Sequence, residues 1–261
     1  MFSFVPTANH VVSMLDPSFL TTNKYKMIVD YHVHSDYNDD ATGTVEECVQ
    51  SALKKGLSSI AITNHVWKTS TWVDDFIDEV KVLRSRYRCH ALTGLEAKII
   101  NINGEVDLLP CYIKEVELVL GALHHLPTRD DYVWLDKESL PALKAAEIIR
   151  DATLNLIARN TVNVVAHPLA FYYSKYSQPF PVDFLEEIVR SASKRGVALE
   201  IYNSKHPLPE EVFAKLISLC VDCEALMTIG SDAHNPSEIG KIDYQKIQSA
   251  IKLALRGVES D

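Results

Sequence analysis

Two short segments near opposite ends of the chain decide its fold: Asp30-Tyr31-His32-Val33-His34 and Gly230-Ser231-Asp232-Ala233-His234. Each lies at the end of an apolar run that predicts a buried strand. The same pattern recurs between them, at Asn64-His65, Gly94-Leu95-Glu96, Leu123-His124-His125 and Ala166-His167-Pro168. A parallel barrel brings the carboxyl ends of its strands to one rim, so these side chains would converge there. Imidazoles and carboxylates gathered in one place are typical ligands of divalent metals.

Predicted strands and helices alternate along the chain. We expect strands at 27–33, 57–63, 91–99, 117–123, 161–166, 197–202 and 226–229. We expect helices at 44–55, 72–88, 137–159, 182–194 and 208–220, one more within 236–255, and a hairpin or excursion at the 101–104 turn. The alternation indicates parallel strands, either in an α/β barrel or in an open doubly wound sheet. The barrel is favoured because the candidate ligands follow nearly every strand, whereas an open sheet gathers its site at one switch point.

Length and charge narrow the function. The 261 residues fit one barrel domain over 1–261, with an irregular lead-in at 1–25. The net charge of -9 argues against binding long nucleic acid, which usually requires a basic patch. It leaves room for a small phosphorylated substrate, because bound cations would reverse the local field. We expect no membrane association, since no signal peptide pattern is present and no run approaches the roughly 20 apolar residues that span a bilayer.

The five cysteines are odd in number and scattered, which predicts reduced thiols and a cytoplasmic location. Cys220 and Cys223 form a lone CxxC within a predicted helix. For this pair, ordinary packing is favoured over a metal or redox role, because single short motifs often occur by chance.

The histidines carry most of the functional signal. His32 and His34 lie two apart in a predicted strand and therefore share a face. Taken alone, this pair fits two hydrogen-bonded core histidines equally well. However, six of the ten histidines lie at or just past the end of a predicted strand, which core packing does not explain: His32, His34, His65, His124, His167 and His234.

Together these motifs resemble the polymerase-and-histidinol-phosphatase (PHP) superfamily, from Asp30 to about His234. The resemblance implies a distorted (β/α)7 barrel with two or three metal ions that cleaves phosphate esters. It implies the metal ligands His32, His34, Asp40, His65, Glu96, His124, His167, Asp232 and His234. Among these, Glu96 would bridge metals, and Glu96, Asp232 and His234 would serve catalysis.

Some of these positions have alternative interpretations. The first-loop ligand is Asp39 or Asp40, with Asp40 preferred because Ala41 follows it. Asn64 stands where relatives carry an aspartate. Glu96 could instead be a salt-bridge partner, and Asp232 could cap the final helix. Asp30 is expected to orient an imidazole rather than to bind metal.

Other polar residues fall in the predicted rim loops. Candidate substrate contacts are His125, Arg129, Lys205 and His206. Glu200 and Asn203, at the end of the sixth predicted strand, and Lys175, in another rim loop, lie at the same predicted rim and could also contact the substrate phosphate. Solvated loop charges are the competing interpretation for each of them. The tyrosines at 172, 173 and 176 would either form an aromatic wall over the site or pack on the barrel edge.

The mixed histidine and carboxylate set suits zinc, manganese or iron(II). Such ions lower the pKa of a bound water from about 15.7 toward 7. We therefore expect hydrolysis of a small phosphate monoester by a metal-bound hydroxide, with histidinol phosphate as the best single substrate. The alternatives are a nuclease or nucleotide phosphodiesterase and an inactive metal-binding scaffold. Substrate specificity depends on loops, and the sequence predicts neither it nor the oligomeric state.

Overall fold

The computed structural model describes residues 29–127, 132–133 and 140–258 of the chain. The lead-in predicted at 1–25 and the candidate contact Arg129 lie outside this range. That the whole chain forms one domain stays a prediction.

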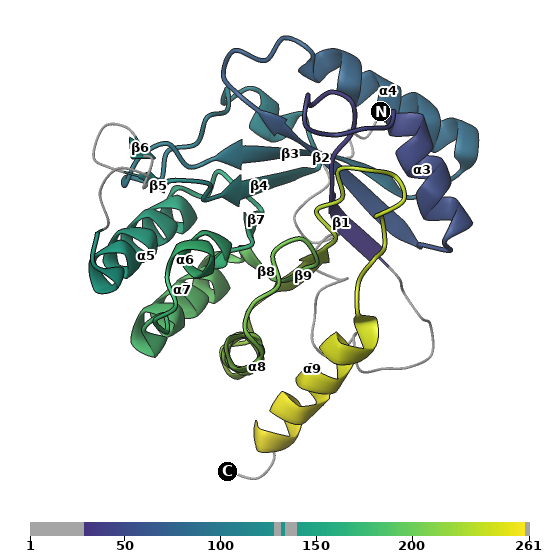
Figure 1. Cartoon of the computed structure of the whole chain (residues 1–261). Coiled ribbons are helices and arrows are strands. Elements are labelled where there is room, and N and C mark those ends of the chain that lie inside the picture. Colours follow the sequence, from purple (N-terminus) through teal and green to yellow (C-terminus); the bar gives the residue numbers. More distant parts are fainter. Residues whose placement is uncertain (1–28, 128–131, 134–139, 259–261) are drawn as a thin grey trace.

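Seven parallel strands form the central sheet in the order β1-β2-β3-β4-β7-β8-β9 (Figure 1). They are β1 (Val29–Val33), β2 (Ser59–Val66), β3 (Ala91–Lys98), β4 (Leu118–Ala122), β7 (Val164–Ala166), β8 (Ala198–Asn203) and β9 (Met227–Gly230). A parallel bridge between Val33 and Ala233 joins the two edges, so the sheet is a nearly closed barrel. This confirms the predicted (β/α)7 architecture.

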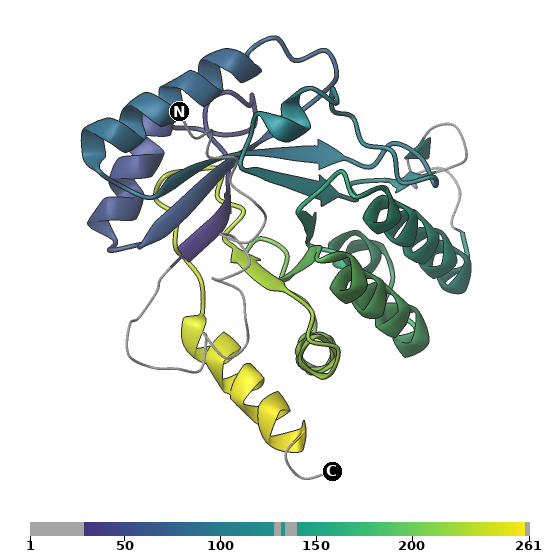
Figure 2. The same ribbon diagram turned by 180° about the vertical axis from the view of Figure 1, so that it is seen from behind.

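The helices lie outside the sheet, and both views show them around its outer face (Figures 1 and 2). They are α3 (Val45–Lys54), α4 (Val73–Tyr87), α5 (Ala142–Arg159), α6 (Ala170–Lys175), α7 (Val182–Arg195), α8 (Glu210–Asp222) and α9 (Tyr244–Val258), with a short 3-10 helix, η1 (Tyr112–Lys114). Their apolar faces and the sheet form one hydrophobic core. The strand ends that carry the polar motifs are left free of helices.

Local sequence signals explain several element ends. Thr44 and Glu47 form the predicted capping box at the start of α3. Gly196 ends α7 in the left-handed conformation (φ 66°) that glycine adopts most readily. The turn predicted at 101–104 is a hairpin, since Ile99 and Val106 form an antiparallel bridge across it.

Besides the short 3-10 helix η1, two further features of the fold were not predicted. One is α6, which is only six residues long. The other is a small antiparallel pair, β5 (Leu126–Pro127) with β6 (Tyr132–Val133). Both are too short to produce a periodic pattern in the sequence.

The contact between β1 and the end of β9 is a hydrogen-bonded seam. Asp30 accepts bonds from the Ser231 amide (2.8 Å), the Ser231 hydroxyl (2.6 Å) and the Gly240 amide (2.7 Å). The Asp232 amide donates to the His32 carbonyl at 2.8 Å. The expectation that Asp30 orients an imidazole is therefore wrong: its carboxylate binds backbone and hydroxyl groups that close the barrel.

The structure bears on two further features of the sequence, the lack of a membrane-spanning run and the Cys220/Cys223 pair. Among the described residues, no helix has the length and apolar character to cross a membrane. The CxxC pair packs as expected, because Cys220 is fully buried in α8 and burial raises the pKa of its thiol.

Candidate metal centre

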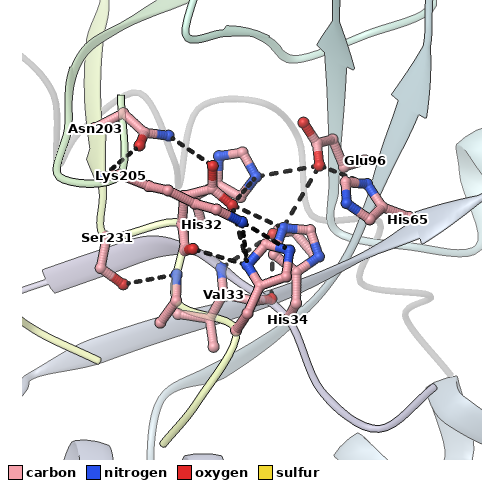
Figure 3. A network of polar contacts seen from close by, with 12 residues as sticks. His32, Val33, His34, His65, Glu96, Asn203, Lys205 and Ser231 are labelled. Carbon is pink, nitrogen blue, oxygen red and sulfur yellow. Dashed lines mark hydrogen bonds and ion pairs between the residues drawn. The ribbon is translucent and has the colours of Figure 1, made fainter. Parts of the chain in front are cut away.

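Glu96, near the carboxyl end of β3, is the hub of the predicted site. Its side chain is 1% exposed, and histidine nitrogens from four strand ends surround its carboxylate oxygens. Figure 3 shows His32, His34 and His65 turned toward this carboxylate. Around Oε2 lie His32 Nε2 (3.3 Å), His34 Nε2 (3.5 Å) and His65 Nδ1 (2.8 Å); around Oε1 lie His124 Nε2 (3.2 Å) and His167 Nε2 (3.0 Å). An ordinary salt-bridge partner does not require five imidazoles, so this arrangement favours a bridging role for Glu96.

The segment after β9 completes the cluster. Asp232 Oδ1 lies 3.1 Å from His34 Nε2 and 3.6 Å from His234 Nδ1. Asp40 Oδ2 lies 3.7 Å from His65 Nε2 and 3.4 Å from His234 Nε2. Asp40 thus lies against two predicted ligands, and its own role as a metal ligand stays a prediction. Asp232 does not cap the final helix, because α9 begins only at Tyr244.

These donors fall into four sets of three residues that lie close enough together to hold a metal ion. In each set, one donor atom from every residue lies within 4.8 Å of the others: His34/His65/His234, His32/His34/Asp232, His32/Glu96/His167 and His65/Glu96/His124. Four buried atoms of the cluster make no well-directed hydrogen bond among the described residues, although ion-pair distances surround three of them: His32 Nε2, His34 Nε2, Glu96 Oε2 and, without such a contact, His167 Nδ1. Buried polar atoms are rarely left unsatisfied. Imidazole nitrogens and carboxylate oxygens that converge in a buried cluster are typical ligands of divalent cations, so the residues present suit a divalent metal.

The electrostatics of the cluster are strongly coupled. Burial alone would lower the pKa of His32, but the carboxylates of Glu200, Asp232 and Glu96 more than offset it and raise the pKa well above 6.5. Burial would raise the pKa of Glu96, yet the neighbouring histidines hold it well below its ordinary value. The pKa of His34 falls to about 4, mainly because of burial. Perturbations of this size in one place are typical of functional sites.

Glu200, on β8, fixes the orientation of His32. Its Oε1 lies 3.0 Å from His32 Nδ1, and its Oε2 accepts the His167 amide at 2.7 Å and the Asn203 side-chain amide at 3.2 Å. With Nδ1–H donating to Glu200, the lone pair of His32 Nε2 points at the centre. Glu200 was predicted as a rim residue. It lies at that rim, but its side chain is buried against two predicted ligands, His32 and His167, rather than solvated. A charged residue inside an apolar strand was the available signal.

Asn38 orients a second predicted ligand, His34, and the sequence did not predict this role. Its Oδ1 lies 3.3 Å from His34 Nδ1 and accepts the His65 amide at 2.7 Å, while its Nδ2 donates to the His65 carbonyl at 2.9 Å. Asn64, in place of an aspartate, bonds to Ser35 and does not touch the imidazoles. No local pattern marks Asn38, because its role depends on β1 and β2 lying side by side.

The backbone at the centre is unusual. His167 (φ 28°) and Asp232 (φ 53°) both have positive φ without being glycine. Such conformations are costly and cluster at functional sites. Gly230 is required for space, since a Cβ there would lie 2.3 Å from His32 Cβ and 2.6 Å from Glu200 Oε1.

Two of the predicted substrate contacts, Lys205 and His206, lie against predicted metal ligands, and a third, His125, is characterised by its burial. Lys205 Nζ is 3.1 Å from His234 Nε2, and His206 Nε2 is 3.6 Å from Asp232 Oδ2 with a side chain 42% exposed. His125 follows His124 and is half-buried, and burial is the main reason that its pKa is lowered. Tyr172 is buried against Tyr173, Tyr176 and Phe180, so it packs on the barrel edge.

Comparison with known proteins agrees with this geometry. Residues 30–204 match the PHP domain family. A probable phosphatase of Shewanella piezotolerans is 28% identical over 84% of this chain and 82% of its own, and one of Acetivibrio thermocellus is 26% identical over 84% of each. The structure of histidinol phosphate phosphatase from Lactococcus lactis, complexed with zinc, L-histidinol and phosphate, is similar with a TM-score of 0.68 at 22% identity, covering 87% of this chain and 93% of that one. The chain therefore belongs to the PHP domain family and is a phosphatase of that family.

Proposed function

We propose that this protein hydrolyses a small phosphate monoester at a centre of two or three divalent ions, either zinc, manganese or iron. The observation that carries the proposal is the contact of both Glu96 oxygens with five histidine nitrogens at 2.8 to 3.5 Å in a buried cluster. Bound divalent ions would supply a nucleophile at neutral pH and offset the charge of the phosphate dianion. The proposed ligands are the nine residues predicted from the sequence.

The protein's own residues would hold and orient the reactants. Glu200 and Asn38 fix two imidazoles so that their Nε2 lone pairs face inward. His206 and Lys205 lie at the outer side of the cluster, where each can donate to phosphate oxygens. Asp232 Oδ1 faces the ligands and its Oδ2 faces His206, so this carboxylate can keep the His206 ring turned toward the substrate.

Histidinol phosphate is the best single candidate substrate. Its support is the likeness in fold to the Lactococcus lactis enzyme, which was solved with L-histidinol and phosphate. The net charge of -9 supports a small substrate over long nucleic acid. A cytoplasmic location, predicted from the scattered thiols, completes the proposal.

The test is a metal-reconstituted screen of phosphorylated metabolites, with p-nitrophenyl phosphate compared against its bis-ester. We expect turnover of the monoester, loss of turnover with chelator, and loss of turnover in His34→Ala and Asp232→Ala proteins that keep their fold. Preference for the bis-ester would favour the phosphodiesterase alternative. A metal-loaded protein without turnover of either ester would instead be a scaffold.

A further inference from the structure

The proposed ligands differ in their exposure to solvent. His32 and His34 are 0% exposed and Glu96 is 1% exposed, so the positions that they form are enclosed. Asp40, His65 and His234 form a second group, which we call the outer group. Their side chains are 59%, 20% and 13% exposed, and Asp40 Oδ2 lies within 3.7 Å of both imidazole Nε2 atoms. A cation held by the outer group would therefore be the most accessible one.

The hydrogen bonds of His234 define its protonation pattern. Its Nδ1 lies 2.9 Å from the Asp232 carbonyl oxygen, which can only accept, so Nδ1 carries the proton. The lone pair is then on Nε2, the atom that faces Asp40 at 3.4 Å. This lone pair is the one that the outer group offers to a metal.

Lys205 already uses that lone pair. Its ammonium lies 3.0 Å from His234 Nδ1 and 3.1 Å from Nε2, and because Nδ1 carries the proton, only Nε2 can accept a hydrogen bond from it. Figure 3 shows the side chain reaching into the cluster from the segment after β8. An ammonium has three donors and no acceptor, so it can donate to Nε2 but cannot share the lone pair with a metal. A divalent ion there would also meet the lysine charge at close range.

We propose that Lys205 is a built-in competitor for the outer metal position, so that this position binds its ion more weakly than the enclosed ones and exchanges it readily. The inference rests on the proposed metal centre. Lys205 is exposed, and its long flexible side chain lets it leave His234 when an ion binds. The ammonium and the outer ion are alternatives on the same nitrogen, so metal supply sets which of them is present.

The experiment measures metal binding rather than turnover. Metal-free protein is titrated with Mn²⁺, and free Mn²⁺ is counted by electron paramagnetic resonance. For wild type we expect one weak site beside the tighter ones. Lys205→Met should tighten the weak site about three- to tenfold, because the competing hydrogen bond and charge are lost. Lys205→Arg keeps the charge and should bind like wild type, as should Lys215→Met on the exposed face of α8.

Asp40→Asn identifies the weak site, since it should remove that site and leave the tighter ones unchanged. Equal weak-site affinity in wild type and Lys205→Met would overturn the inference while leaving the proposed function intact. Weaker binding in Lys205→Met would also overturn it, because the lysine would then support the ion. A wild-type protein that binds no Mn²⁺ and turns over no monoester would overturn both proposals.

Discussion

Replacing Glu200 by glutamine should switch the tautomer of His32 while keeping the fold. Glu200 Oε2 accepts hydrogen bonds from the His167 backbone amide at 2.7 Å and from the Asn203 side-chain amide at 3.2 Å. In the glutamine variant only the side-chain oxygen can accept both bonds, so it must occupy the Oε2 position. The glutamine NH₂ then takes the Oε1 position, 3.0 Å from His32 Nδ1. That nitrogen would have to accept, which moves the proton to Nε2 and blocks the lone pair that faces the centre.

The expected cost is about 10- to 100-fold in metal affinity, the usual effect of losing an outer support of a ligand. This corresponds to roughly 1.4 to 2.7 kcal/mol of binding free energy. The side chain at position 200 is 2% exposed, so the enclosing residues disfavour a move of the glutamine to another rotamer. The melting temperature of the metal-free protein should fall as well, because Glu200 is the carboxylate that contributes most to the raised pKa of the buried His32, and glutamine removes that charge.

Metal affinity would be measured by competition with a chromophoric chelator, and the His32 tautomer by ¹⁵N-resolved NMR of histidine side chains. Glu187→Gln, on the exposed surface of α7, is the matched control. If Glu200→Gln binds metal as wild type does, with Nδ1 of His32 still protonated, the reasoning is refuted.

Three further predictions concern the same region. Gly230→Ala should lower the free energy of unfolding by about 1–3 kcal/mol in urea titrations, because its Cβ would overlap the Cβ of His32; an unchanged midpoint would contradict the close packing. The pKa values of His32 and His65 are raised in the folded protein, so protonation of these imidazoles stabilises the metal-free protein below about pH 6.5. This stabilisation is lost as the pH rises through the folded pKa values. Zinc binding must displace the same protons, so it competes with protonation. Zinc should therefore raise the melting temperature more at pH 8 than at pH 6, as scanning fluorimetry would show, and the reverse order would count against this coupling. Trp67 is 44% exposed and its ring lies 6.4 Å from that of His65, so its indole can stack on an aromatic leaving group. Trp67→Leu should therefore raise the KM for p-nitrophenyl phosphate about fivefold relative to the KM for glycerol 2-phosphate. An equal change in KM for both esters would exclude such stacking.

Much of the site could be predicted because parallel strands bring their carboxyl ends together. His32, Glu96 and His167 follow different strands, and that rule alone predicts that they meet. The supports of these ligands could not be predicted in the same way. Whether the Glu200 side chain faces the histidine cluster depends on the register of β8 with β7 and β9, which shifts between Glu200 and Tyr202. Asp30 bonds to the Gly240 amide, 210 residues away, which leaves no local pattern.

The seam between β1 and β9 has a consequence for biosynthesis. His32 and His34 leave the ribosome long before Asp232 and His234 are made, and only docking of the last strand brings the two pairs together. Until then a nascent chain presents an incomplete chelate, with lower avidity for stray ions. For the proposed metal centre, loading is therefore expected only once the barrel is complete, and a chain truncated before β9 would lack the second pair altogether.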